Sequence, residues 1–383
     1  MATAPEEGAR LASLDAFRGF AIAGMVLVNN PGDWGHLYAP LAHAEWNGWT
    51  FTDLVFPFFL FAAGAAMPFS LGRRLAAGGE RASLALQLAR RAAVIFAIGL
   101  LLNLLPAFDF ATVRIPGVLQ RIALCVLIAA PLVVYFPPRA PWAWIALLFA
   151  AYTVPMLFLA VPDASGAVAA GALEPGRDAG AFLDRLVLDG HLWSKSRTWD
   201  PEGLLSTLPA ACSLLFGVLA GNALRAGAGS ARLFAAGIAA LLLGLALDAV
   251  FMPINKNLWT PSYCVFMTGW SLVAFAAFHA AMDANPRPAA REAARRWLLP
   301  FTIYGMNALF LFAFSGLVAR VLGFVRIAGE GSAPVSLKAW LFAPLRALPV
   351  SPEAASLLFA IAFNVAMFAV AWLLWKKRWF FKA

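Results

Sequence analysis

Charged residues are scarce in this chain. Only 13% of its 383 residues are Asp, Glu, Lys or Arg, whereas 62% are hydrophobic. A soluble domain carries about 25% charged residues, and a soluble fold of this length has too little interior to hide so much apolar surface. The composition therefore excludes an ordinary soluble protein and indicates a chain that lies in a lipid bilayer.

Cysteine is equally rare. The three cysteines each lie inside an apolar segment, without CxxC or Cys/His spacing, and are typical of small buried side chains. We therefore expect neither a disulfide framework nor a metal site. The cysteines are Cys125, Cys212 and Cys264.

The net charge of +9 could indicate a nucleic-acid partner in a soluble protein. Here, however, Lys and Arg occur in short runs between apolar stretches, which is how cytoplasmic anchors of membrane helices are distributed. We expect a lipid bilayer and no nucleic acid as partner.

Apolar segments of membrane-spanning length recur along the whole sequence. They predict an all-α, polytopic membrane protein of about ten transmembrane helices, with residues 1–383 forming one transmembrane domain. A small-x-small motif at 42–44 lies too far beyond the first segment to be its cleavage site, so an uncleaved first helix is expected. The segments are 15–30, 51–70, 92–107, 117–136, 142–161, 203–221, 231–251, 263–281, 299–318 and 354–375.

Basic clusters set the expected orientation. Arginines and lysines gather at 73–91, at 287–296 and at 376–382, and an even number of helices places all three on one side. The positive-inside rule makes that side cytoplasmic. Both termini are then cytoplasmic, with short tails at 1–14 and 376–383.

The loops on the opposite side of the membrane hold most of the polar side chains that are not arginine. We expect the substrate to be bound on that side. Polar groups at membrane depth are costly and usually mark a function or a paired contact. Asp15 and Arg18, three residues apart, most simply form an ion pair. His36, His191 and His279 lack polar company that would suggest catalysis.

His43 has such company. It opens the run HAEWNGWTFTD, in which Trp46, Asn47, Thr50 and Asp53 gather at the start of the second helix. Imidazole can take and return a proton near neutral pH, and a carboxylate such as Asp53 can orient it. The alternative is that His43 is an interfacial loop residue and that Asp53 only caps the helix.

Other polar clusters flank later helices. Gln120 and Arg121 enter the fourth segment and need internal partners. Tryptophan lies beside acidic, amide and basic groups at 199–202 and at 255–259, a composition typical of a sugar-binding wall. As an alternative, each tryptophan could be an interfacial anchor. The proposed substrate contacts are Trp46, Asn47, Asp200, Glu202, Asn255, Lys256 and Trp259.

Together these stretches resemble the heparan-alpha-glucosaminide N-acetyltransferase family of membrane acyltransferases. The blocks that carry the resemblance are SLDAFRG at 13–19, VNNPG at 28–32, HAEWNGWTFTDLVFPFFLF at 43–61, RIPGVLQRIAL at 114–124, WDPEGLLSTLPA at 199–210 and INKNLWTPSY at 254–263. The resemblance implies transfer of an acetyl group from cytoplasmic acetyl-CoA to a glucosamine amine across the membrane. It also implies that His43 is the catalytic residue and that Asn29 lies beside it.

No counterpart of the lumenal domain of the lysosomal enzyme precedes the first helix in this sequence. We therefore expect a bacterial cell-envelope or recycled amino sugar as acceptor and the bacterial inner membrane as location. Whether His43 acts as a base or becomes acetylated is open, because both schemes use the same side chain.

Coenzyme phosphates need fixed positive partners, and we expect them at the cytoplasmic end near Arg73 or Arg74; Arg18, Gln120 and Arg121 are further candidate coenzyme contacts. Membrane anchoring alone also explains Arg73 and Arg74. An amino-sugar transporter is the main alternative function and a scaffold protein the second. A homodimer is compatible with either kind of activity.

Overall fold

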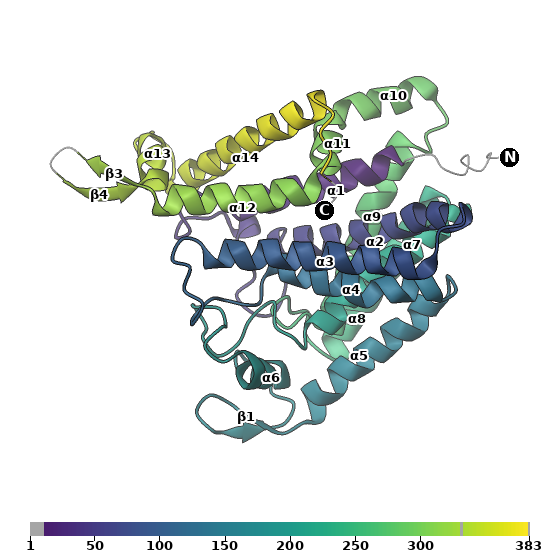
Figure 1. Ribbon diagram of the computed structural model, residues 1–383, viewed down its shortest axis with the longest axis horizontal. Coiled ribbons are helices and arrows are strands. Elements are labelled where there is room, and N and C mark those ends of the chain that lie inside the picture. Colours follow the sequence, from purple (N-terminus) through teal and green to yellow (C-terminus); the bar gives the residue numbers. More distant parts are fainter. Residues whose placement is uncertain (1–10, 330–331, 382–383) are drawn as a thin grey trace.

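The computed structural model describes residues 11–329 and 332–381 and is almost entirely helical (Figure 1). Two small antiparallel hairpins are the exceptions among the described residues. The helices are α1 (Ala12–Val28), α2 (Thr52–Ala76), α3 (Arg81–Leu104), α4 (Val118–Tyr135), α5 (Ala140–Phe158), α6 (Ala179–Leu188), α7 (Thr207–Arg225), α8 (Ser230–Val250), α9 (Pro261–Met282), α10 (Pro288–Trp297), α11 (Leu299–Met306), α12 (Ala308–Phe324), α13 (Leu337–Arg346) and α14 (Pro352–Lys376), with a 3-10 turn η1 (Ala39–Leu41). The strands are β1 (Val161–Pro162), β2 (Val168–Ala169), β3 (Arg326–Gly329) and β4 (Ser332–Ser336).

The ten expected segments all fall on helices in the described part of the chain. Eight of these helices are individually long and apolar enough to cross a membrane, and α11 with α12, bent by 82° at their break, makes a ninth. Helix α1 has 17 residues and is about 26 Å long at 1.5 Å per residue, slightly shorter than a hydrocarbon core of about 30 Å. The predicted all-α membrane class is confirmed.

Inner and outer helices differ in how much of their surface the protein covers. The most apolar windows of α2 and α7 are 78% and 72% buried, whereas those of α5 and α8 are 22% and 17% buried. Outer helices that are apolar all round are what a bilayer solvates well. The inner helices are therefore the ones that can hold a polar site away from lipid.

Glycine allows the inner helices to approach closely. A Cβ atom at Gly64 of α2 would lie 1.9 Å from the carbonyl oxygen of Leu214 in α7. A Cβ at Gly305 of α11 would lie 1.8 Å from the carbonyl oxygen of Asp15 in α1. Small residues at such crossings allow the backbone-to-backbone packing that stabilises membrane helices.

Loops far apart in sequence meet at one end of the bundle, which we call the polar face. It is built from the loops 29–51, 105–117, 159–206 and 251–260. Backbone hydrogen bonds join Gly48 N to the Ile254 oxygen at 2.7 Å and Ile115 N to the His191 oxygen at 3.0 Å. Helix α6 and strand β1 lie at this end in Figure 1, whereas α10 lies at the other. Candidate site residues from several loops are thus brought together.

Candidate active site

His43 and Asp53 form a short hydrogen bond on the polar face. His43 Nδ1 lies 2.6 Å from Asp53 Oδ1, and the carboxylate is 1% exposed while the imidazole is 44% exposed. Asp53 Oδ2 accepts hydrogen bonds from the backbone N–H groups of Thr50 at 3.0 Å and Ala44 at 3.1 Å. Because a carboxylate only accepts, Nδ1 carries the proton. Asp53 thus contacts the imidazole and also holds two backbone N–H groups of the preceding loop, while its catalytic role stays a prediction.

Lys256 completes this cluster from the other half of the chain. Its Nζ lies 3.0 Å from His43 Nδ1, 3.2 Å from His43 Nε2 and 3.6 Å from Asp53 Oδ1. Burial lowers the pKa of the Lys256 ammonium, while the negative charges of Asp53 and Glu202 act in the opposite direction. We expected Lys256 on a sugar-binding wall; the structure places it directly against the imidazole.

Buried contacts hold the loop that carries Lys256. Asn255 Nδ2 donates to Asn47 Oδ1 at 3.0 Å, and Asn255 Oδ1 accepts from Leu258 N at 2.9 Å. Trp259 has a φ of +53°, which is uncommon for a residue other than glycine, and its Nε1 donates to Ser213 Oγ at 3.1 Å. Both Asn255 and Trp259 are buried, so the structure gives them a positioning role. As substrate contacts they stay a prediction.

Tyr263 was missed in the sequence and links this loop to helix α2. Its hydroxyl donates to the backbone oxygen of Asp53 at 2.7 Å. Its ring packs edge-on against Trp259, with centroids 5.2 Å apart. Tyr263 ends the INKNLWTPSY block that carries the resemblance, but nothing in that run indicated a hydrogen bond to helix α2.

An ion network joins two further loops beside the cluster. Arg114 binds Asp200 through Nε at 2.8 Å and through Nη2 at 2.6 Å, and Nη2 also lies 2.6 Å from Glu202 Oε2. Burial alone would lower the pKa of the Arg114 guanidinium, but the two carboxylates raise it above its usual range. Asp200 and Glu202 therefore brace the polar face, and their expected role as substrate contacts stays a prediction.

Tryptophan side chains form a partly exposed wall next to this network. Trp46 and Trp199 pack edge-to-face at 5.1 Å, and Trp193 packs against Trp199 at 5.9 Å. A depression open to solvent lies beside Trp199 and is lined also by Asn257, the residue after Lys256. Aromatic faces beside amide and carboxylate groups are the composition that binds a sugar ring.

Gln120 and Arg121 lie in the first turn of α4 and are both buried. Arg121 Nη2 donates to the Gly203 oxygen at 3.1 Å and to Ser206 Oγ. The guanidinium carbon lies 5.2 Å from the ring centroid of Trp259, within cation–π range. Arg121 thus has internal partners for Nη2, whereas its Nε and Nη1 have no acceptor among the described residues.

The other predicted residues are not joined to His43 by contacts in the structure. Asn29 ends α1, is exposed, and its side chain makes no hydrogen bond with a described residue. Arg18 binds Asp15 Oδ1 at 2.9 Å, which confirms the expected ion pair. Arg74, near the end of α2 away from the polar face, donates to Gln87 Oε1 at 2.7 Å. The Arg73 side chain lies outside the described part of the structure.

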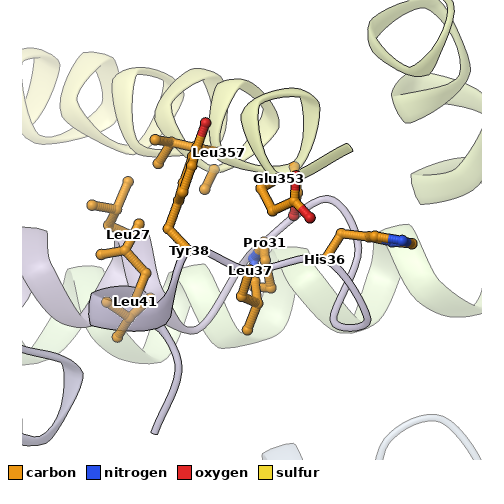
Figure 2. A pocket seen from close by; sticks show the side chains of 11 residues that line it. Leu27, Pro31, His36, Leu37, Tyr38, Leu41, Glu353 and Leu357 are labelled. Atoms are coloured by element: carbon orange, nitrogen blue, oxygen red, sulfur yellow. The ribbon is translucent and has the colours of Figure 1, made fainter. Parts of the chain in front are cut away.

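A second cavity, of about 280 Å³, lies between the end of α1, the loop that follows it and the first turns of α14. Figure 2 shows Tyr38 beside α14 and His36 at one end of the view. His36 Nδ1 lies 2.9 Å from Asp33 Oδ2, and both side chains are well exposed. His43 is not among the lining residues. The molecule therefore holds a second, open His–Asp pair that can serve as a control for the first.

Comparison with known proteins shows what this chain is similar to. The family model described as heparan-alpha-glucosaminide N-acetyltransferase, catalytic, matches residues 10–170. Heparan-alpha-glucosaminide N-acetyltransferase of Homo sapiens is 29% identical over 357 residues, and the protein of the same name from Mus musculus is 28% identical over 361 residues. The alignments cover 79% of this chain in both cases, but 52% of the human and 53% of the mouse protein. The chain therefore spans about half the length of these relatives, and it is similar to the heparan-alpha-glucosaminide N-acetyltransferases, most clearly in residues 10–170.

Proposed function

We propose that this protein transfers the acetyl group of acetyl-CoA to the amine of a glucosamine-type sugar. The observation that carries the proposal is the His43–Asp53 pair, a half-exposed imidazole oriented at 2.6 Å by a buried carboxylate. The names of the human and mouse relatives support the same chemistry. The polar face is the proposed acceptor side, outside the cytoplasm of a bacterial inner membrane, with both termini in the cytoplasm.

In the direct scheme the sugar amine attacks the thioester carbonyl carbon. A C–N bond forms, the C–S bond breaks, and the amine loses one proton to His43 Nε2, the nitrogen that Asp53 leaves unprotonated. The coenzyme departs as a thiol after taking that proton. In the alternative scheme Nε2 attacks first and holds the acetyl group until the amine displaces it. Both schemes need the tautomer that Asp53 fixes.

The Nζ of Lys256 lies 3.2 Å from His43 Nε2, within hydrogen-bonding distance of the nitrogen that would take the proton. An arriving sugar has hydroxyl oxygens that can accept from the ammonium and draw it away from that nitrogen. Trp46 and Trp199 are the proposed faces for the sugar ring. Asn29 is the proposed donor to the acetyl carbonyl oxygen, as the family resemblance implies.

The decisive experiment uses purified protein in detergent with labelled acetyl-CoA and a panel of amino sugars. Wild-type protein should give N-acetylated product. His43→Ala should still bind acetyl-CoA but should lose at least about 10²-fold in transfer, the typical contribution of general acid–base catalysis. His36→Ala is the matched control, because His36 also pairs with an aspartate at 2.9 Å, and it should keep wild-type transfer.

Two results would contradict the proposal. His43→Ala with wild-type transfer would remove the imidazole from the mechanism. Sugar accumulation in proteoliposomes without any acetylated product would instead favour the transporter. Asp53→Asn should reduce transfer less than His43→Ala if Asp53 only orients the ring, and equally if the tautomer depends on it.

A further inference from the structure

Two consecutive side chains of α4 carry buried hydrogen-bond donors that have no acceptor among the described residues. The donors are Nε2 of Gln120 and both Nε and Nη1 of Arg121. Gln120 is 3% exposed and Arg121 is 1% exposed. An unsatisfied buried donor costs about 1–3 kcal/mol, and more when it belongs to a charged group. Three such atoms on two neighbouring residues of α4 therefore indicate one or more ligand oxygens as acceptors.

Both side chains are held in place. Arg121 uses Nη2 for the Gly203 oxygen and Ser206 Oγ, which fixes the guanidinium and leaves Nε and Nη1 free. A Cβ at Gly99 of α3 would lie 2.4 Å from Gln120 Oε1, and one at Gly117 would lie 2.7 Å from it. The amide of Gln120 therefore occupies space that is available because residues 99 and 117 are glycines without a Cβ atom. The free donors belong to a built site, not to mobile surface groups.

The charges around Arg121 decide which kind of oxygen fits. Glu202 and Asp200, which also bind Arg114, and Asp184 lie within electrostatic range of the guanidinium and partly offset its charge. A phosphate would add further negative charge to this set, whereas a neutral carbonyl oxygen adds none. The site is also more deeply buried than His43, whose imidazole is 44% exposed. An uncharged carbonyl group of the acyl donor, several bonds away from the reacting thioester, is therefore a suitable ligand for Gln120 and Arg121.

We propose that Gln120 and Arg121 bind amide carbonyl oxygens of the pantetheine arm of the acyl donor. The inference rests on the proposed acetyl-CoA dependence. The arm carries two amides between the phosphates and the thioester, so its carbonyl oxygens supply the acceptors that α4 lacks. In this arrangement the bundle binds the arm of the donor, and the phosphates bind elsewhere.

Truncated donors test the proposal without the phosphates. N,S-diacetylcysteamine keeps the amide nearest the thioester, whereas S-hexyl thioacetate replaces it with methylene groups. The measured quantity is the ratio of kcat/KM for the two donors. Wild-type protein should prefer the amide donor by about tenfold or more, because hydrogen bonds to charged groups are the stronger ones. Arg121→Gln and Arg121→Lys should both reduce this ratio to near one.

The matched control is Arg320→Gln. Arg320 lies in α12 and donates to the Gly316 oxygen at 3.2 Å and to Asn103 Oδ1 at 3.1 Å, so its replacement should leave the ratio as in wild type. Equal use of the two donors by wild-type protein would overturn the proposal, even if the Arg121 variants do not fold. A folded Arg121 variant that keeps the preference would also overturn it and assign the free donors to buried water. A wild-type protein inactive with acetyl-CoA itself would instead refute the proposed function.

Discussion

Asp184 should make the stability of this protein depend on pH near neutrality. The carboxyl lies on α6, is 2% exposed, and accepts one backbone hydrogen bond from Leu204 N at 2.8 Å. Burial raises the pKa of Asp184 to about 7, against the opposing effect of the Leu204 hydrogen bond and with a contribution from the negative charge of Asp200. The substitution Asp184→Asn keeps the acceptor oxygen and removes the charge.

The magnitude follows from the difference between the folded and unfolded pKa of Asp184. A rise from 3.8 to about 7 corresponds to roughly 4 kcal/mol, at about 1.4 kcal/mol per pKa unit. Because the folded pKa is the higher one, the folded state binds the proton more tightly. The favourable contribution is fully present below pH 3.8, is lost as the pH rises through about 7, and is absent above it.

Thermal unfolding in detergent, followed by tryptophan fluorescence between pH 5 and pH 9, measures this effect. Asp184→Asn should become progressively more stable than wild type as the pH rises to about 7, and the difference should then level off. Asp189→Asn, at the exposed end of the same helix, is the control and should show no such trend. A stability difference between Asp184→Asn and wild type that is constant across this range would refute the reasoning.

Two further predictions concern packing and orientation. Gly64→Ala should lower the melting temperature markedly, because its Cβ would lie 1.9 Å from the Leu214 oxygen, whereas Gly229→Ala, with nothing within 4 Å, should have little effect; equal melting temperatures would contradict the close α2–α7 contact. Single cysteines introduced at Asn285 and Asp189 should react with impermeant reagents from the cytoplasmic and the outer side respectively, since they lie at opposite ends of the bundle. Labelling of both from one side would contradict the topology.

The membrane helices could be predicted because the bilayer requires long apolar segments. The structure inside the polar loops could not. Helix α6 and the β1–β2 hairpin lie in a stretch expected to be one long loop, where polar and small residues give no clear periodicity. Helix α10 was also missed, because its clustered arginines were interpreted only as topology signals. Local hydrogen bonding and docking against the bundle, neither visible in composition, decide these elements.

The candidate site was predictable where its members are close in sequence. His43 and Asp53 are ten residues apart, and their pairing followed from the chemistry of one run. Lys256 lies 213 residues from His43, and no single-sequence pattern encodes that contact. Asn255 and Trp259 were expected on an open wall but are buried, because tryptophan beside amide groups describes a packed loop as well as a sugar site. The ion pair between Arg114 and Asp200 could not be predicted either, because the two residues are 86 positions apart in the sequence.

The ion pairs that join the loops of the polar face help to distinguish an enzyme from a transporter. The Lys256–Asp53 contact at 3.6 Å joins the loop before α9 to the first turn of α2. The Arg114 contacts with Asp200 and Glu202 at 2.6 Å join the loops before α4 and α7. Opening the polar face would break these ion-pair contacts between the loops. A carrier that opened this face in each cycle would have to separate such pairs repeatedly. The proposed acyltransferase can keep them closed, because in the proposed scheme the donor's arm carries the acetyl group and only the acceptor sugar needs to reach the exposed imidazole.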